Sequence, residues 1–174
     1  TVVDRKNVYF FNKDSNTVVW DVNIVSNATM YTVSISPDGR YIAAGTDSGS
    51  VYVFLTSDKD NVWLHSDGLD GKITDISFSG DSSHLIIGTE TGRVHVYSSS
   101  GGDPVTMLQP DEVSCVSAGV NSKYYIYGTT GGMLTLFDGI NGADIWQKNI
   151  GGDVSDCVFN GKGTFVFAGS DNKK

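Results

Sequence analysis

The chain has 174 residues, of which 39% are hydrophobic and 18% are charged, with 21 glycines but only 3 prolines. A chain of this length can bury a sizeable core, and its composition argues against disorder and favours short strands joined by tight turns. The net charge of −8 argues against nucleic acid or an anionic membrane surface as a partner, and the absence of any run of about 18 apolar residues argues against a membrane span.

In chain order, residues 1–24 predict a turn and two strands, the first of them within "DRKNVYFF". Residues 30–66 predict four strands. The first has apolar residues at i, i+3 and i+5, namely Met30, Val33 and Ile35, and "YIAAGT", an alternating "SVYVF" and a weaker "NVWLHSD" follow it. Turn residues such as "SPDGR" separate these runs, as expected between short antiparallel strands.

The same order of strands returns in residues 73–108 and 113–150, and its first half returns in residues 154–174. A glycine near the end of each second strand marks the period, with spacings of 43, 40 and 41 residues between Gly45, Gly88, Gly128 and Gly169. Four short strands in each repeat of about forty residues are typical of β-propeller blades. A parallel βα array would need helical periodicity between strands, which is absent, and a sandwich would not need so regular a repeat. The sequence therefore predicts an all-β propeller domain of four-stranded antiparallel blades over residues 1–174.

The repeat resembles two families of propeller proteins. "VSISPDGRYIAAGTDSGSVYVF" resembles a WD-repeat blade, although it lacks the Gly-His pair and the closing Trp-Asp. "DGINGADIW" is similar to the PQQ-like (quinoprotein-dehydrogenase-like) repeat, in which Asp, Gly and Trp follow one another at four-residue intervals, here Asp138, Gly142 and Trp146. "NKDSNTVVW" keeps that spacing with Asn in place of Asp and Gly, so the motif is complete in one blade. The phrase "SISPDGRYIAAGT" is also similar to tandem propeller repeats of archaeal and bacterial surface proteins.

We name the four strands of each blade a to d in chain order. Residues 1–24 then hold strands c and d of one blade, residues 154–174 hold strands a and b of another, and 30–66, 73–108 and 113–150 are complete blades. Three arrangements stay open. The ends join into a closed four-bladed ring, two chains exchange ends in an eight-bladed homodimer, or the chain is part of a longer one and contacts its missing blades. Open ends would leave unpaired strand edges that favour association.

The two cysteines, Cys115 and Cys157, lie on first strands one blade apart, but Cys115 stands one repeat position earlier. Because successive strand side chains point to opposite faces, we expect the two sulfurs to be aimed differently and to form no disulfide. Cys157 is interpreted as a small core residue, and a reactive thiol at Cys115 is the less favoured interpretation. No spacing typical of a metal site, an activated nucleophile or a phosphate-binding loop occurs, so we expect no catalytic, cofactor or metal-binding residues.

Acidic residues gather in the d–a and b–c turns, which a propeller places on the same face, and Lys72 and Arg93 are the main cations among them. One hypothesis is an acidic rim suited to a basic peptide or a cation. The other is ordinary solubilising turn chemistry. The rim residues are Asp47, Asp67, Asp70, Glu90, Asp111, Glu112 and Asp153, with Asp171 at the same place in the last repeat.

Trp20, Trp63 and Trp146 each lie on a fourth strand. A ring there can cover the junction between blades and bury roughly 150–250 Å². We interpret all three as structural blade-docking residues.

These observations favour a non-catalytic protein-interaction or structural scaffold that presents loops on a propeller face, with a protein or a basic peptide as partner. The alternative is an enzymatic or cofactor-binding propeller whose central site is complete only in the full-length protein or an oligomer. Asp75 and Asp156, near the starts of two a strands, are the only residues that suit such a site. The PQQ-like resemblance does not extend to the calcium-ligating and catalytic residues of the dehydrogenases, so we expect no cofactor. The scarcity of Lys and the abundance of Ser, Thr, Asn, Asp and Gly favour an extracellular or cell-surface location.

Overall fold

The computed structural model describes residues 7–23, 28–58, 61–65 and 69–171, and all regular elements in these ranges are β-strands. The strands are β1 (Asn7–Phe11), β2 (Val18–Asn23), β3 (Met30–Ile35), β4 (Tyr41–Thr46), β5 (Val51–Leu55), β6 (Asn61–His65), β7 (Ile73–Phe78), β8 (His84–Thr89), β9 (Arg93–Ser98), β10 (Val105–Leu108), β11 (Val113–Ala118), β12 (Tyr124–Thr129), β13 (Met133–Asp138), β14 (Asp144–Asn149), β15 (Val154–Phe159) and β16 (Val166–Ser170). Within these ranges no helix is long and apolar enough to cross a membrane.

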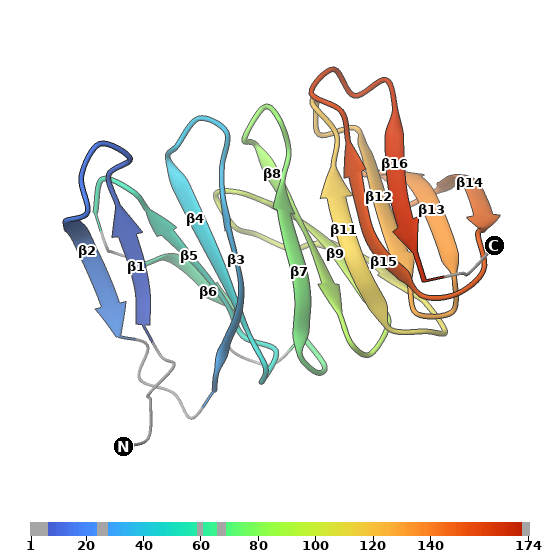
Figure 1. The fold of residues 1–174 in the computed structure, drawn as a ribbon, viewed down its shortest axis with the longest axis horizontal. Helices are drawn as coiled ribbons and strands as arrows, with labels where there is room; N and C mark the ends of the chain where they lie inside the picture. The colour runs from blue at the N-terminus through green and yellow to red at the C-terminus, as the bar shows by residue number, and fades with distance from the viewer. Residues whose placement is uncertain (1–6, 24–27, 59–60, 66–68, 172–174) are drawn as a thin grey trace.

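The strands form antiparallel sheets that stand side by side in a row (Figure 1). β3–β6, β7–β10 and β11–β14 are four-stranded and pair in chain order, whereas β1–β2 and β15–β16 are two-stranded. The predicted all-β fold with four-stranded antiparallel blades is confirmed. The two hairpins lie at opposite ends of the row, so the chain forms an open arc and the alternative of a closed four-bladed ring is wrong for this structure (Figure 1).

The turns between strands a and b show how short polar residues set the hairpins. In the first complete sheet, Asp38 accepts hydrogen bonds from the Ser36 hydroxyl at 2.6 Å and from the Arg40 backbone N–H at 3.0 Å. Gly39 has a φ of +71°, which L side chains rarely adopt, and its N–H donates to the Ser36 carbonyl at 2.8 Å. The "SPDG" run therefore returns the chain and places β4 beside β3.

A bulge recurs near the start of strands β3, β7, β11 and β15, where the pairing with the b strand shifts by one residue. Such a bulge puts two successive side chains on the same face of the sheet. On β7 both of these side chains bond to the neighbouring sheet, since Thr74 donates to the Val113 carbonyl and Asp75 accepts from the Val116 N–H. Ser114, on the bulge of β11, likewise donates to the Val154 carbonyl. The bulges of β7 and β11 therefore supply polar contacts at the junctions between consecutive sheets, each of which we call a seam.

The glycine that recurs about every forty residues lies at each seam, where the next sheet packs against it. A Cβ on Gly88 would lie 2.7 Å from Cγ1 of Val113, and one on Gly45 would lie 2.5 Å from Cγ2 of Ile73. Both distances are too short for a real side chain, so glycine lets the next a strand approach the b strand closely. Gly128 meets Val154 in the same way.

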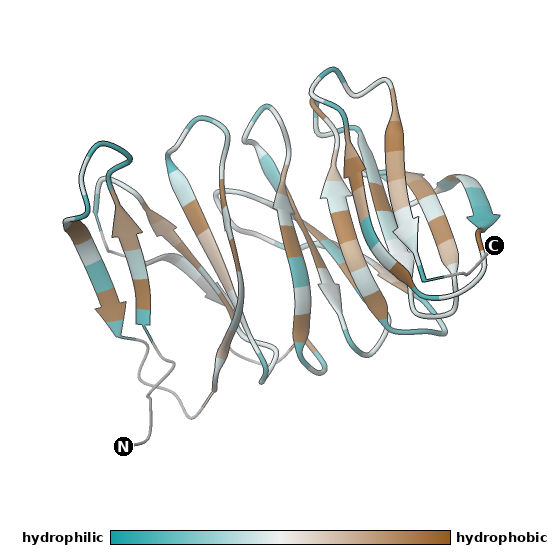
Figure 2. Cartoon of the chain, viewed as in Figure 1, coloured by the Kyte–Doolittle hydropathy of each residue, from teal (hydrophilic) through white to brown (hydrophobic). Residues whose placement is uncertain are grey.

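The hydrophobic core is divided among the seams rather than gathered at one centre. Apolar side chains form bands along the strands, and polar residues concentrate in the turns (Figure 2). In the seam between β3–β6 and β7–β10, the buried residues of the first sheet come from its b and c strands and those of the second from its a, b and c strands. The buried residues there include Ala43, Val51 and Val53 from the first sheet and Ile76, Leu85 and Ile87 from the second.

Candidate functional site

The b–c and d–a turns lie against each other at one end of the sheets. In successive sheets the N–H of the b–c turn donates to a carbonyl of the d–a turn, from Asp47 to Thr29, Glu90 to Lys72, Thr130 to Glu112 and Asp171 to Asp153, at 3.0–3.1 Å. We call the surface made by residues 28–29, 47–50, 69–72, 90–92, 109–112, 130–132, 150–153 and 171 the turn face. The structure thus brings together the described residues of the acidic rim, while Asp67 lies outside the described ranges.

Three of the acidic side chains hold the turns in place. The Asp47 carboxylate accepts the Thr29 N–H at 2.8 Å, Glu90 accepts the Lys72 N–H at 2.9 Å, and Asp171 accepts the Asp153 N–H at 2.7 Å. These bonds satisfy backbone donors just before three of the four a strands, where the strand ladder cannot reach them. These three carboxylates therefore have a structural role in the turns. The sequence alone could not distinguish them from carboxylates that are free to bind a partner.

Lys72 on the turn face and Arg93 beside it are already engaged. Arg93 Nη2 lies 2.6 Å from Asp70 Oδ2, and Lys72 Nζ lies 4.1 Å above the centre of the Tyr31 ring. Among the described residues, none of the ion pairs involves Asp111, Glu112 or Asp153. The turn face therefore retains carboxylates whose charge no cation in the described part of the chain neutralises.

Asp111 borders a recess of about 290 Å³ on the turn face. Its carboxylate lies against the backbone of Gly131, where a Cβ would come within 2.6 Å of Asp111 Cγ. Gln147 and Asn149 also line the recess, and their side chains bond to Asp144 and to the Gly151 N–H. The recess combines one carboxylate with neighbouring amides, a set of groups that can accept hydrogen bonds from a lysine or an arginine.

The tryptophans lie at the seams. Trp20 Nε1 donates to the Thr56 carbonyl of the next sheet at 2.9 Å, and its ring centre is 6.2 Å from that of Phe54. Trp63 repeats both contacts one sheet later, donating to the Ser99 carbonyl at 3.1 Å and packing 5.1 Å from Tyr97. Trp146 has no following c–d pair among the described strands and is 38% exposed.

Residues 33–121, just over half of the chain, match a family model described as the anaphase-promoting complex subunit 4 WD40 domain. The chain belongs to this WD40 family. A chain in the crystal structure of a mitotic checkpoint complex is also similar, with a TM-score of 0.84 and 16% identity. That match covers 95% of this chain and 51% of the other, so this chain spans about half the length of its structural relative. No curated protein sequence matches.

These findings confirm the WD-repeat resemblance, because the matched residues include the quoted "VSISPDGRYIAAGTDSGSVYVF" run. The similarity to the checkpoint-complex chain, at 16% identity, shows the propeller fold alone. The PQQ-like and surface-protein resemblances stay predictions. WD40 propeller domains typically act as protein-interaction scaffolds.

The two cysteines of this WD40 chain form no disulfide, but they lie closer together than the sequence indicated. Cys115 and Cys157 are both free, as predicted, and both are buried. They point to opposite faces of their own sheets, but those faces meet in one seam, so the two thiols are neighbours. A hydrogen bond with Cys115, followed by burial, raises the pKa of the Cys157 thiol far above its ordinary value. Burial also argues against the reactive-thiol interpretation of Cys115.

Asp75 accepts hydrogen bonds within its own strand and across a seam. Its Oδ2 accepts the Val116 N–H across the seam at 2.9 Å, and its Oδ1 accepts the Ile76 N–H at 2.8 Å. Burial raises the pKa of Asp75, opposed in part by these two donors, and the charge of Asp156 raises it further. In the part of the chain that the structure describes, no group of three or more His, Cys, Asp or Glu side chains could hold a metal ion.

Proposed function

We propose that this WD40 chain is a non-catalytic scaffold whose turn face binds a basic segment of a partner protein. Family membership supports the interaction class, since WD40 propeller domains typically bind proteins. The observation that carries the basic preference is that Asp111, Glu112 and Asp153 have no counter-ion among the described residues, while Arg93 and Lys72 are engaged with Asp70 and Tyr31.

In this proposal a lysine or arginine of the partner enters the recess at Asp111, and its neighbours contact Glu112 and Asp153. Exposed ion pairs contribute only about 0.2–1 kcal/mol each, so binding depends on several of them acting together. Salt screens such contacts over a Debye length of about 8 Å at physiological ionic strength. The proposed interaction is therefore weakened by salt, and its charge complementarity acts mainly on specificity and the rate of encounter.

The test is binding of a fluorescently labelled oligolysine peptide, followed by anisotropy at low and physiological salt, with oligoglutamate as the negative probe. The double variant Asp111→Lys/Glu112→Lys is expected to weaken oligolysine binding by about fivefold or more. The control is Asp14→Lys/Asp103→Lys, which makes the same change of net charge in c–d turns, away from the turn face. Unchanged binding in the first variant, or an equal loss in the control, contradicts the proposal. Circular dichroism and thermal unfolding verify that both variants remain folded.

A further inference from the structure

The two end hairpins correspond to the two halves of one blade. In each complete sheet the b strand pairs with the c strand, as in β4–β5, β8–β9 and β12–β13. β16 is a b strand with no c strand beside it among the described residues, and β1 is a c strand with no b strand beside it. At one end of the arc the b strand β16 therefore has a free edge where a c strand would pair. At the other end the c strand β1 has a free edge where a b strand would pair.

The complete sheets specify how these two edges would pair. Each seam glycine is paired with the same repeat position of its c strand, as Gly45 is with Val51, Gly88 with Val94 and Gly128 with Leu134. On the c–d side, Leu136 pairs with Trp146 in the same way as Phe10 pairs with Trp20. Transferring this register pairs Gly169 with Val8, Ala168 with Tyr9 and Phe167 with Phe10.

The exposed side chains on one face of the β15–β16 hairpin fit the recess at the opposite end of the arc. Phe167 is 61% exposed, whereas its counterpart Ile126 is fully buried against the next sheet. At the other end, Val33 is 63% exposed, whereas its counterpart Ile76 is only 4% exposed. A largely apolar recess of about 380 Å³ lies beside Val33. Its apolar lining comes from Val8, Tyr9, Phe10, Val33, Ile35 and Ile42. Pairing Phe167 with Phe10 would place the Phe167 ring in this recess.

A second recess, beside Trp146 at the β15–β16 end, is complementary to side chains of β1 at the opposite end. A recess of about 410 Å³ at the β15–β16 end is lined by Trp146 together with Leu136 and Phe159. In the formed seams, Trp20 and Trp63 pack against the aromatic residue of the next c strand, which is Phe54 or Tyr97. The equivalent residue of β1 is Phe11, which is exposed. Phe11 would therefore fill the recess beside Trp146, and the Lys13 carbonyl would take the place of the Thr56 and Ser99 carbonyls as acceptor for Trp146 Nε1.

The seam glycine and the seam aspartate are both present at the open end. A Cβ on Gly169 would meet nothing within 4 Å, in contrast to Gly45, Gly88 and Gly128, so the space kept for the next a strand is vacant. Asp156 stands where Asp75 accepts an N–H from the next sheet. One position differs, because Val158 replaces the serine that accepts such a bond in two formed seams.

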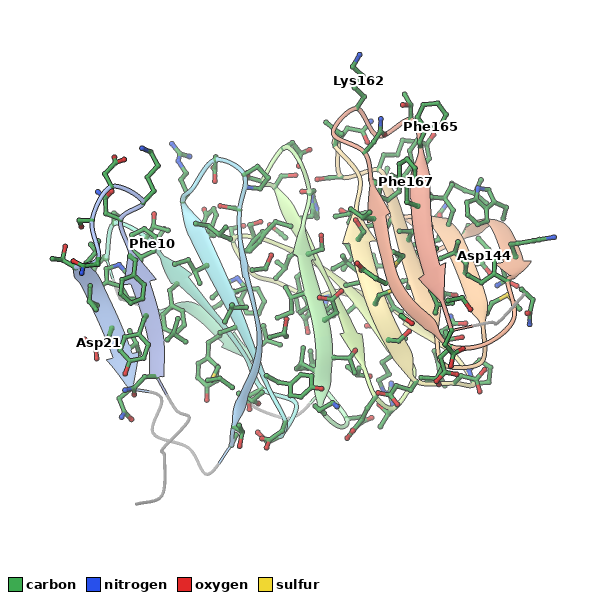
Figure 3. The ribbon with its side chains drawn as sticks, in the orientation of Figure 1. Phe10, Asp21, Asp144, Lys162, Phe165 and Phe167 are labelled. Atoms are coloured by element: carbon green, nitrogen blue, oxygen red, sulfur yellow. The ribbon has the colours of Figure 1, made fainter. Side chains whose placement is uncertain are left out.

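We propose that the β15–β16 end of one copy binds the β1–β2 end of a second copy, with β16 and β1 paired in the register given above. Within one copy the two ends cannot meet, since Phe10 lies at one end of the arc and Phe165 and Phe167 at the other (Figure 3). Each copy contributes three complete blades and two halves, so two copies related by a twofold axis close into an eight-bladed ring. The end faces are separate from the turn face, so this inference goes beyond the proposed function and does not rest on it.

The first test is the solution mass of the whole chain, measured by light scattering over a range of concentrations. We expect the mass to approach twice 18.6 kDa as concentration rises. Gly169→Val and Phe167→Asn are expected to keep the mass at one copy while the circular dichroism spectrum stays unchanged, because both positions are open to solvent in a single copy. The control Leu108→Asn removes a 68% exposed side chain from the outer strand of a complete sheet and should leave the pair of copies intact.

A mass of one copy at every concentration would overturn the proposal and would assign the end faces to other blades. Masses that grow beyond two copies, or an unaffected pair in Gly169→Val, would overturn it as well. In a variant that stays a single copy, oligolysine binding to the turn face can still be measured. Failure of this inference is therefore distinguishable from failure of the proposed function.

The second test addresses the register. Tyr9 and Ala168 are exposed in a single copy, and directly opposed residues of antiparallel strands have Cβ atoms about 4.5–5.5 Å apart. A mixture of Tyr9→Cys and Ala168→Cys chains, treated with oxidised glutathione, is expected to form a disulfide that links one chain of each kind. Neither variant alone should form it, and the buried native thiols are shielded from the reagent. Equal cross-linking in either variant alone would contradict the register.

Discussion

The seam between β7–β10 and β11–β14 and the open β15–β16 end contain the same repeat positions in different surroundings. Ile86, on β8, is fully buried in the seam, whereas Phe167, its counterpart on β16, is largely exposed. Gly88 is pressed against Val113, whereas Gly169 faces empty space. The difference teaches that burial in this fold is a property of two neighbouring blades. A residue on a seam face contributes its full share to stability when the next sheet is present, as expected for repeat architectures, in which contacts between neighbouring repeats supply a large part of the stability.

The largest difference in the free energy of unfolding is expected when the apolar side chain two residues before the seam glycine is truncated. Ile126→Ala should lower the free energy of unfolding by about 3–5 kcal/mol, because the side chain is fully buried and leaves a cavity. Phe167→Ala, at the same repeat position, should change it by less than about 0.5 kcal/mol in a single copy. Urea denaturation at low protein concentration measures both. Similar losses in the two variants would contradict the account.

A methyl group at the seam glycine should have the next largest effect. Gly128→Ala is expected to cost about 2–3 kcal/mol, since the new Cβ overlaps Val154 and Cys115 and the sheets must separate. Gly169→Ala meets no neighbour and should be neutral in a single copy. Thermal unfolding of the two variants provides the comparison, and a destabilised Gly169→Ala chain would show that this end is already packed.

Substitutions of Trp63 and Trp146 should show a smaller difference in the free energy of unfolding. Trp63→Phe removes the hydrogen bond to the Ser99 carbonyl and should cost about 1 kcal/mol beyond the lost ring area. Trp146→Phe, whose indole lies at the open end, should cost little until a second copy binds. Equal effects of the two substitutions on unfolding at low protein concentration would count against the role assigned to the seams.

The smallest expected effect is electrostatic. Partial burial alone would raise the pKa of Asp81. Hydrogen bonds from the Ser122 hydroxyl across the seam, and from Ser79 and Ser83, outweigh it and lower the pKa to about 2. Because the folded pKa lies below the ordinary 3.8, this stabilisation is complete above about pH 4 and is lost as the pH falls toward 2.

Asp81→Asn is therefore expected to lose about 1 kcal/mol at neutral pH, a value discounted for the solvent exposure of Asp81. The difference from the parent chain should shrink as the pH approaches 2. Urea unfolding at several pH values measures this profile. A difference that does not change with pH would assign the effect to packing instead of charge.

Much of the fold could be predicted from the sequence, because Gly45, Gly88, Gly128 and Gly169 recur at a nearly constant interval and each blade carries the same turn signals. The closure of the ring could not be predicted. It depends on how far successive sheets rotate when they pack, which no pattern within one blade reports. The contact between Cys115 and Cys157 was missed for a related reason, since strand alternation describes one sheet and the seam joins opposite faces of two.

The candidate site was predictable in position but not in chemistry. The d–a and b–c turns had to share one end of the blades, so the location of Asp111 and Asp153 followed from the repeat. Whether a carboxylate is free depends on which backbone donors it reaches. Asp47 and Glu90 bind turn N–H groups, and the composition of the turns gives no sign of this.

The most direct test of the central claim is amide hydrogen exchange at two protein concentrations, below and above the one at which the mass doubles. The account predicts that residues 7–11 and 165–171 exchange quickly in the dilute sample. In the concentrated sample the protection of residues 165–171 should rise toward that of residues 124–129, and that of residues 7–11 toward that of residues 133–137, which occupy the same places in a complete sheet. Fast exchange at both ends whatever the concentration, with residues 124–129 protected throughout, would contradict the claim that the two ends are halves of one blade.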